Sequence, residues 1–417
     1  MQTNKIHWTS LLILIVLGLS ASSALLMALG LGINSLIGLF SDAVDPAAQM
    51  ISAFTFGFEG VVLLLCSWFV LQKTMGHEQA ATLLKTPFDA WQVAAVIGLA
   101  SMSVAIGAAV ISTEVVWLAW FILPVLTVVV IVPPIWLLFS IGSKGIELGQ
   151  RWRVFGILGL SMTLSPLIMV VMEFVLLAGA IIIGAVFVAV QQPDLVREFT
   201  RLGALLQRAA DQDALLKLLA PYISNPLLIV AAVGYVAVIV PLIEELFKPL
   251  AVWIFARNLE SPAQGFAMGL LSGAAFALIE SLNASASGTE SWYVIVSVRA
   301  STSLLHVTTS GLVGWGIASA FREKRISRFF AAYFSAVAIH GIWNACAVGA
   351  GLSVVGEFIG RPEWLFNLMP AMAGGMSVLG VGMLLVLLAS NKKLRNSSSS
   401  PAPQSALLRE EEGQGVQ

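Results

Sequence analysis

Long apolar runs recur along most of the chain. A helix needs about 20 residues to cross roughly 30 Å of hydrocarbon. Runs of about that length or more occur approximately at 10–36, 51–72, 91–112, 115–142, 154–190, 226–256, 263–284, 292–318, 329–350 and 366–389. This pattern predicts an all-α polytopic membrane protein with about ten transmembrane helices. The first run is far longer than the apolar part of a signal peptide, so we expect it to be a retained first span.

The composition supports this class and excludes others. Of the 417 residues, 58% are hydrophobic and 11% are charged, whereas a soluble domain has about 25% charged residues. The formal net charge of −1 gives no sign of the basic face that a nucleic-acid partner requires. The sequence also lacks a phosphate-binding loop of the Walker type, so nothing indicates nucleotide-driven transport.

The fifth run is too long for one straight crossing. Pro166 and Glu173 mark either a kink or a break into two spans. With one kinked span, the loops on one side of the membrane carry almost every cation, namely Lys5, Lys73, Lys85, Lys144, Arg151, Arg153, Arg257, Arg322, Lys324, Arg325, Arg328, Lys392, Lys393 and Arg395. Because cytoplasmic loops are enriched in Lys and Arg, we expect one kinked fifth span and two cytoplasmic termini.

We expect five regions along the chain. They are an N-terminal membrane region of about five spans (1–190), an amphipathic extracytoplasmic loop (191–225), a membrane core (226–350), a last span (351–390) and a disordered cytoplasmic tail (391–417). The tail is expected to be disordered because it is polar and low in complexity.

The loop between the fifth and sixth spans is expected to contain two helices. Its apolar residues, from Leu195 to Ala209, follow helical spacing. Pro193-Asp194 suits a helix start, and a second short helix is expected over 211–219. Two interpretations remain open. The hairpin is either a connector that rests on the membrane surface or a lid over a lateral path for substrate.

Ionisable residues interrupt the apolar runs at nine positions, which are Glu59, Glu173, Glu244, Glu245, Lys248, Glu280, Arg299, His306 and His340. Seven of the nine fall in the sixth to ninth spans. Charged groups inside a bilayer are costly, and they mark functional sites by default. Glu59 and Glu173 stand alone in the N-terminal half, and we expect them to be packing or interface carboxylates.

The sixth span contains the densest cluster. Glu244 and Lys248 are four residues apart and can neutralise each other on one helix face. Glu245 is rotated by about 100° from Glu244, so we expect it to need a partner on another helix. Pro241 and Pro249 each remove a backbone hydrogen bond, so we expect a bent backbone, which is tolerated at membrane depth where it lines a cavity.

The seventh span combines a stripe of small residues with a carboxylate. Gly265, Gly269 and Gly273 recur every four residues, which lets a neighbouring helix approach closely. Glu280 lies one turn after Phe276 on the same face. It either belongs to the polar cluster or is solvated near the outer interface.

The eighth and ninth spans supply two histidines. Arg299 and His306 are seven residues apart and share nearly one face, and His340 and Asn344 are one turn apart. Carboxylates and neutral imidazoles together can activate water by two routes. A divalent metal such as zinc takes such ligands, for which Glu245, His306 and His340 are the candidates. Without a metal, a buried carboxylate serves as general base and a histidine stabilises the oxyanion.

The same residues resemble the PrsW-type family of intramembrane proteases, which is related to the CAAX-processing and bacteriocin-processing membrane proteases. Glu244-Glu245-Leu246-Phe247-Lys248 matches the E-E-x-x-K signature of that family. Gly265 to Glu280 is similar to its glycine-rich segment, Arg299 to His306 to its arginine-to-histidine stretch, and His340-Gly341-Ile342-Trp343-Asn344 to its closing H-x-x-x-N. The resemblance covers roughly 235–350. The family often has asparagine directly after the seventh-span glutamate, where this chain has Ser281, with Asn283 nearby.

The resemblance implies a PrsW-like intramembrane (metallo)protease that hydrolyses peptide bonds of membrane-anchored proteins. Family members are associated with clipping membrane-anchored regulators, including anti-sigma factors. The implied partners are therefore a protein substrate of that kind and the lipid bilayer, and the implied location is a bacterial cell membrane. Regulated proteolysis in signalling is the implied role.

The resemblance also implies a role for each matching residue. Glu244 and Glu245 would supply the water-activating base or a metal carboxylate, and Glu280, His306 and His340 would complete the water or metal shell. Asn344 would orient His340 or donate to the oxyanion. Charge would be balanced by Lys248 and Arg299.

Two other functions use the same residues differently. A proton- or ion-coupled transporter would relay protons through buried Glu and His. Transporters often have repeated halves with paired broken helices, whereas this polar cluster lies entirely in the C-terminal half. A non-catalytic scaffold with a decayed site is the third possibility, but the complete set of Glu244, Glu245, His306 and His340 argues against decay.

Overall fold

A computed structural model describes residues 7–41, 44–77, 81–83, 89–191, 193–207, 212–223, 225–359 and 363–398 of the chain. These residues are almost entirely helical. Ten of the helical segments in them are long and apolar enough to cross a membrane. The expected fold class, an all-α polytopic membrane protein of about ten spans, is therefore confirmed.

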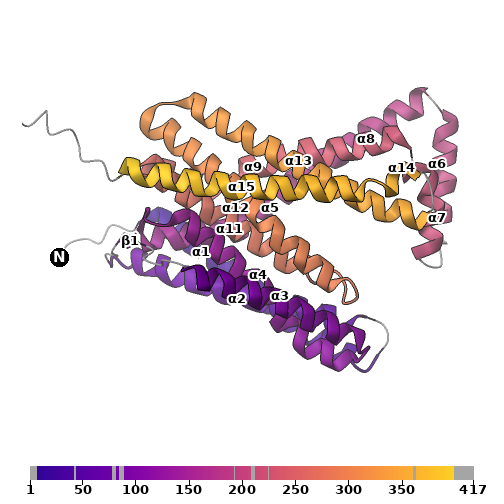
Figure 1. The fold of residues 1–417 in the computed structure, drawn as a ribbon, viewed down its shortest axis with the longest axis horizontal. Coiled ribbons are helices and arrows are strands. Elements are labelled where there is room, and N and C mark those ends of the chain that lie inside the picture. Colours follow the sequence, from indigo (N-terminus) through magenta and orange to yellow (C-terminus); the bar gives the residue numbers. More distant parts are fainter. Residues whose placement is uncertain are drawn as a thin grey trace, which may run out of the picture.

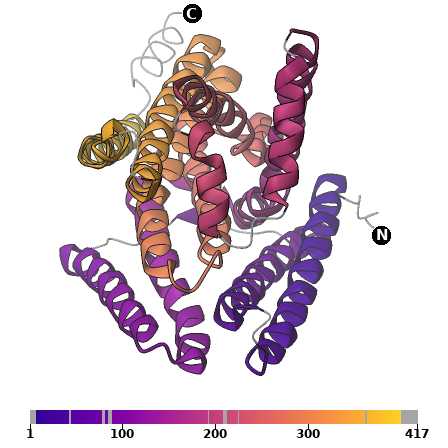
Figure 2. The ribbon, with the colours of Figure 1, turned by 90° about the vertical axis from the view of Figure 1, so that its right-hand side faces the viewer.

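The first five spans are single helices: α1 (Trp8–Gly38), α2 (Pro46–Thr74), α3 (Ala90–Ser112), α4 (Val116–Ser143) and α5 (Arg151–Gln191). Two short strands, β1 (Ala81–Leu83) and β2 (Glu147–Gln150), pair antiparallel next to the start of α5. Figure 2 shows the α1–α2 pair and the α3–α4 pair on one side of the molecule, with later helices on the other.

The fifth span is one continuous helix, as the distribution of cations predicts. It has 41 residues and contains Pro166 in its interior. A helix of that length is about 60 Å long at 1.5 Å per residue, which is more than a bilayer needs. The part beyond Glu173 carries many exposed apolar side chains, among them Phe174 and Ile183.

Helices α6 (Pro193–Leu206) and α7 (Gln212–Ile223) follow α5. They confirm the two helices expected in this loop, although residues 208–211 between them lie outside the described part. Both run across one end of the bundle, roughly perpendicular to the long helices (Figure 1). The hydroxyl of Tyr222 donates to Glu198 over 3.0 Å and joins the two helices. Whether the pair is a connector or a lid stays a prediction.

The remaining spans follow in the C-terminal half. The sixth consists of α8 (Pro226–Gly234), the π-helix η1 (Tyr235–Ile239), α9 (Val240–Phe247) and α10 (Leu250–Ile254), and a 3₁₀ turn η2 (Ala256–Asn258) comes next. The others are α11 (Pro262–Ala284), α12 (Trp292–Glu323), α13 (Ile326–Ile359) and, after the short α14 (Glu363–Phe366), α15 (Met369–Ser398).

Both ends of the described chain lie at the same end of the bundle. The ring of His7 packs edge-on against Trp152 at the start of α5. Asn391, near the end of α15, donates to the carbonyl of Gly142 at the end of α4 over 2.8 Å. This agrees with ten crossings. The helix continues to Ser398, so the first residues of the segment expected to be a disordered tail are helical; the rest of that segment lies outside the described part.

Helices α11 and α12 form the centre of the molecule. Of their most apolar stretches, 83% and 72% of residues are buried, a larger share than in the other described spans. The small-residue stripe of α11 permits this close contact. A Cβ atom added at Gly269 would lie 2.2 Å from the carbonyl oxygen of Ser310 on α12. The expected close approach of a neighbouring helix is therefore confirmed.

Candidate active site

The sixth span is interrupted where the two glutamates lie. The π-helix η1 precedes α9, and α9 ends at Phe247, just before Pro249. Pro241 and Pro249 lack the amide hydrogens that would continue the helix ladder. The helix is therefore interrupted on both sides of the Glu-Glu pair, and α9 presents Glu244 and Glu245 from a short helical segment.

Lys248 contacts both glutamates. Its Nζ atom lies 2.9 Å from Oε2 of Glu244 and 2.8 Å from Oε1 of Glu245. Glu245 was expected to need a partner on another helix, but it also has Lys248 on its own segment, because residues three apart, as well as four apart, are neighbours on a helix surface. The lysine side chain is fully buried, as is that of Glu245, whereas 12% of the Glu244 side chain is exposed.

Each histidine has one carboxylate at 2.7 Å from a ring nitrogen. Nδ1 of His340 lies 2.7 Å from Oε1 of Glu245. Nε2 of His306 lies 2.7 Å from Oε2 of Glu280, which also pairs with Arg299. The two imidazole rings are 5.6 Å apart between their centroids and nearly perpendicular. Glu280 therefore belongs to the polar cluster, although 33% of its side chain is exposed.

The short carboxylate contacts favour one placement of the imidazole hydrogens, although Nζ of Lys248 also lies 3.3 Å from Nδ1 of His340. A carboxylate accepts, so we assign a hydrogen to Nδ1 of His340, facing Glu245, and to Nε2 of His306, facing Glu280. The other nitrogen of each neutral ring keeps its lone pair. For His306 this is Nδ1, which lies 2.9 Å from Nζ of Lys248 and accepts from it. For His340 it is Nε2, which lies 3.8 Å from Oε2 of Glu244.

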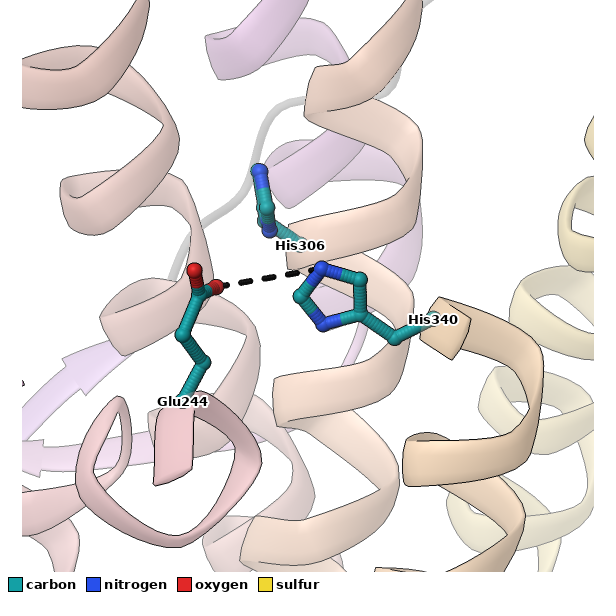
Figure 3. Close-up of side chains that lie close together, drawn as sticks. All are labelled: Glu244, His306 and His340. Atoms are coloured by element: carbon teal, nitrogen blue, oxygen red, sulfur yellow. Dashed lines mark ion pairs between the residues drawn. The ribbon is translucent and has the colours of Figure 1, made fainter. Parts of the chain in front are cut away.

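Glu244, His306 and His340 bring three potential metal ligands together. One donor atom from each of the three lies within 4.8 Å of the other two (Figure 3). They come from α9, α12 and α13. The expected ligand set contained Glu245, but in the described part of the chain the structure groups Glu244 with the histidines. Oε1 of Glu245 instead contacts Lys248, His340 and the hydroxyl of Thr309.

The comparisons with known proteins decide the family. The profile described as PrsW family intramembrane metalloprotease matches residues 166–374. The chain belongs to the PrsW family of intramembrane metalloproteases. It is accordingly an integral membrane protein that acts on membrane-protein substrates in the bilayer. Comparisons with curated proteins and with solved structures gave no match. The family assignment does not favour the alternative of an ion-coupled transporter.

The match to the PrsW family extends from α5 into α15, well beyond 235–350. It therefore includes Glu173, which the sequence pattern left alone in the N-terminal half. In the structure Glu173 interacts electrostatically with Glu244, Lys248 and Glu280. Its backbone carbonyl accepts a hydrogen bond of 2.8 Å from the hydroxyl of Tyr235 in η1. Helix α5 is thus a wall of the candidate site, since Met169 also packs against Ile243 and Phe276.

Glu59, the other isolated carboxylate, lies elsewhere. It is buried in α2 and accepts a hydrogen bond of 2.9 Å from the side-chain amide of Asn283. Asn283, which stands near the position where the family often has asparagine, therefore contacts α2. The packing role expected for Glu59 agrees with this placement.

Helix α11 fixes the position of His306. A Cβ added at Gly273 would lie 2.1 Å from the carbonyl oxygen of His306, so only glycine permits this approach. The ring of Phe276, one turn later, packs edge-on against His306 at 5.0 Å between centroids, and Nζ of Lys248 lies 4.9 Å from the centroid of the same ring. The glycine stripe therefore positions a PrsW-motif histidine as well as the helix.

Asn344 does not contact His340 in the way that was expected. Its side-chain amide donates to the backbone carbonyl of Val236 in η1 over 3.0 Å. The helical spacing that places His340 and Asn344 on one face of α13 is confirmed. The partner of Asn344 differs, because a carbonyl of the interrupted sixth span is available to it.

Sequence reasoning missed two contacts of this site. The hydroxyl of Thr309 donates to Oε1 of Glu245 over 3.2 Å, and that of Ser272 donates to the carbonyl oxygen of Lys248 over 2.6 Å. Thr309 follows His306 by three residues and so shares its helix face, a signal that could have identified it. The sequence carries no comparable signal for Ser272, since its partner is a backbone group.

A large cavity lies elsewhere in the protein. It has a volume of about 840 Å³ and opens between the ends of α4, α11, α12 and α15, where Glu147, Gln264, Glu323 and Lys393 are among its lining residues. None of the PrsW-motif residues lines it. The chemistry of the side chains, and not the size of a cavity, therefore locates the candidate site.

Proposed function

We propose that the protein hydrolyses peptide bonds of membrane-anchored proteins at the centre formed by Glu244, His306 and His340. The observation that carries this proposal is the convergence of three donor atoms within 4.8 Å from three separate helices. A set of two imidazoles and one carboxylate is typical of catalytic zinc sites in hydrolases. We infer that a divalent cation such as zinc is held by these three residues.

The surrounding residues fit a divalent cation. Metal-bound histidines usually donate their second ring N–H to a carboxylate, which fixes the tautomer and the ring orientation. Glu245 lies in that position for His340, and Glu280 for His306. Nε2 of His340 therefore keeps a lone pair that can bind a metal, whereas Nδ1 of His306 accepts from Nζ of Lys248, so the lysine would have to move aside for His306 to bind one.

The charges of the cluster also fit. Three carboxylates, those of Glu244, Glu245 and Glu280, face two cations, Lys248 and Arg299. The cluster thus has an excess of negative charge when all its acidic groups are ionised. An excess of negative charge in an apolar environment attracts a cation.

Each residue has a distinct role in the proposed reaction. The bound cation would make a water molecule acidic enough to ionise near neutral pH and would polarise the scissile carbonyl group. Glu244, the more exposed of the paired glutamates, would be the carboxylate that holds the cation. Glu245 orients His340, and Lys248 keeps both glutamates ionised in an apolar environment.

The position of the other residues follows from the same reasoning. Glu280 orients His306, and Arg299 balances its charge.

We place the protein in a bacterial cell membrane with both termini in the cytoplasm, because most cations of the loops lie on that side. We propose membrane-anchored regulators, such as anti-sigma-factor-like proteins, as the substrates, and regulated proteolysis as the role. Comparison of the membrane proteome of cells with the wild-type chain and with Glu244→Gln tests the substrate class.

The decisive experiment uses purified full-length protein in proteoliposomes with a membrane-anchored test peptide. We expect Glu244→Gln, His306→Ala and His340→Ala each to abolish cleavage and to lower the zinc content measured by elemental analysis. Glu59→Gln, which changes a buried carboxylate outside the site, is the matched control and should retain both. Full cleavage and full metal content in Glu244→Gln and His306→Ala would disprove the proposal.

A further inference from the structure

The π-helix η1 leaves one backbone carbonyl of the sixth span without a donor from its own helix. The amide of Val240 donates to the carbonyl of Tyr235, five residues earlier, which is the π register. In this register the next amide would donate to Val236, but it belongs to Pro241, which has no N–H. The α-helical partner of Val236 is Val240, whose amide is already used. A carbonyl without a donor is costly at membrane depth.

Helix α13 supplies the missing donor. The side-chain amide of Asn344 lies 3.0 Å from the carbonyl oxygen of Val236 and donates to it. One turn earlier, Gly341 lets the two backbones meet. A Cβ added at Gly341 would lie 2.2 Å from the carbonyl oxygen of Ala237, the group to which an α-helical amide at position 241 would donate. Asn344 therefore supplies the donor for Val236, and Gly341 allows the close backbone approach that places Asn344 there.

The same face of α13 contacts the sixth span beyond Pro241. The hydroxyl of Tyr333 donates to the carbonyl of Leu242 over 2.7 Å, and His340 reaches Glu245 over 2.7 Å. The contacts of α13 thus lie on both sides of the proline. Glu244 and Glu245 follow Pro241 within about one helical turn. The backbone conformation at η1 therefore determines where these carboxylates lie relative to His340.

We propose that Asn344 is a positioning residue: it completes the backbone of η1 and thereby holds Glu244 and Glu245 in register with His340. It acts through Val236 and not through the substrate. This role differs from that of an oxyanion donor or of a direct partner of His340. Its consequence for catalysis rests on the proposed function above.

A double-mutant cycle between Asn344 and Pro241 tests the proposal. Asn344→Leu removes the donor, and Pro241→Ala restores a backbone N–H that can reach Val236 in the π register. We expect Asn344→Leu to lower kcat for the membrane-anchored test peptide by roughly 100-fold, since small displacements of catalytic groups have effects of that size. In the Pro241→Ala background, the fold-loss of kcat caused by Asn344→Leu should be at least about tenfold smaller.

Zinc affinity, measured by chelator competition on the full-length protein, is the second readout. We expect it to fall in Asn344→Leu and to recover in the double variant, because the Glu244–His340 geometry is lost and regained. Equal losses of kcat and of zinc affinity in both backgrounds would overturn the proposal. If the Leu variant does not elute as a monodisperse protein, Asn344→Ala in the same two backgrounds provides the same comparison.

Two controls separate this role from general destabilisation. Asn391→Leu removes an asparagine that donates to the carbonyls of Gly142 and Lys144 at the end of the bundle, and it should leave kcat unchanged. Gly341→Ala pushes α13 from η1, and Pro241→Ala should not rescue it. If wild-type protein cleaves nothing, the proposed function fails, whereas the zinc-affinity cycle still decides the role of Asn344.

Discussion

Nδ1 of His340 lies 2.7 Å from Oε1 of Glu245, while Nε2 of the same ring lies 3.8 Å from Oε2 of Glu244. Two adjacent glutamates therefore face two different nitrogens of one imidazole. A proton on Nδ1 makes Glu245 the acceptor that orients the ring, and it leaves Nε2 with a lone pair beside Glu244. Under the proposed function, the double-glutamate motif would combine a carboxylate that orients His340 with one that binds the cation.

This division predicts unequal effects of two isosteric substitutions. Glu245→Gln should lower zinc affinity by roughly 10–100-fold, the usual cost of changing a group that orients a metal-bound histidine. Glu244→Gln should lower it further, because a carboxylate ligand is lost. Chelator competition on purified protein measures both values. A larger loss for Glu245→Gln than for Glu244→Gln would show that the two roles are reversed.

The buried ion pairs of Lys248 predict that replacing this residue strongly lowers the free energy of unfolding. Lys248→Met keeps the length of the side chain but leaves Glu244 and Glu245 without their shared cation. Removing one partner of a buried ion pair costs about 3–5 kcal/mol. Arg153→Met is the matched control, because its partner Glu260 has a side chain that is 61% exposed, and such pairs contribute about 0–1 kcal/mol. Unfolding in detergent, followed by circular dichroism, compares the two. Similar losses in both variants would contradict the prediction.

The location of the site could be predicted from sequence because ionisable residues are rare in apolar spans. Their clustering in the sixth to ninth spans, together with the order of the motifs, indicated the residues that the structure brings together. Close approach of a neighbouring helix to α11 followed from Gly265, Gly269 and Gly273 alone. These are local signals, which depend on residue type and on helical spacing.

The contacts of individual side chains could not be predicted in the same way. Helical phase arithmetic assumes a regular helix, but η1 contains π turns, and each added residue rotates the rest of the helix by about 100°. Which neighbouring helices Glu244 and Glu245 face therefore depends on a bulge that the sequence does not show. The partner of Asn344 is a carbonyl of that same bulge, so it could not be predicted from the sequence for the same reason.

The glycine stripe predicts that a larger side chain at Gly273 disturbs the packing of α11 against α12. In Gly273→Ala, the added Cβ would lie 2.1 Å from the carbonyl oxygen of His306, so α11 and α12 must separate. Overpacking of this kind costs about 1–3 kcal/mol, and displacement of His306 should reduce zinc affinity. Gly98→Ala is the control, since no atom lies within 4 Å of the added Cβ. Unchanged zinc affinity in Gly273→Ala would show that the close approach does not position His306.

The contact between Glu59 and Asn283 predicts that the N-terminal spans support the catalytic core. Asn283→Leu should destabilise the protein by about 1–3 kcal/mol, because it leaves the buried Glu59 carboxylate without its hydrogen-bond donor. Glu59→Leu combined with Asn283→Leu should cost less than the sum of the single changes, since no unpaired polar group remains. Thermal unfolding of the four proteins in one detergent measures the coupling. Strict additivity would mean that the hydrogen bond between α2 and α11 contributes nothing to the stability of the core.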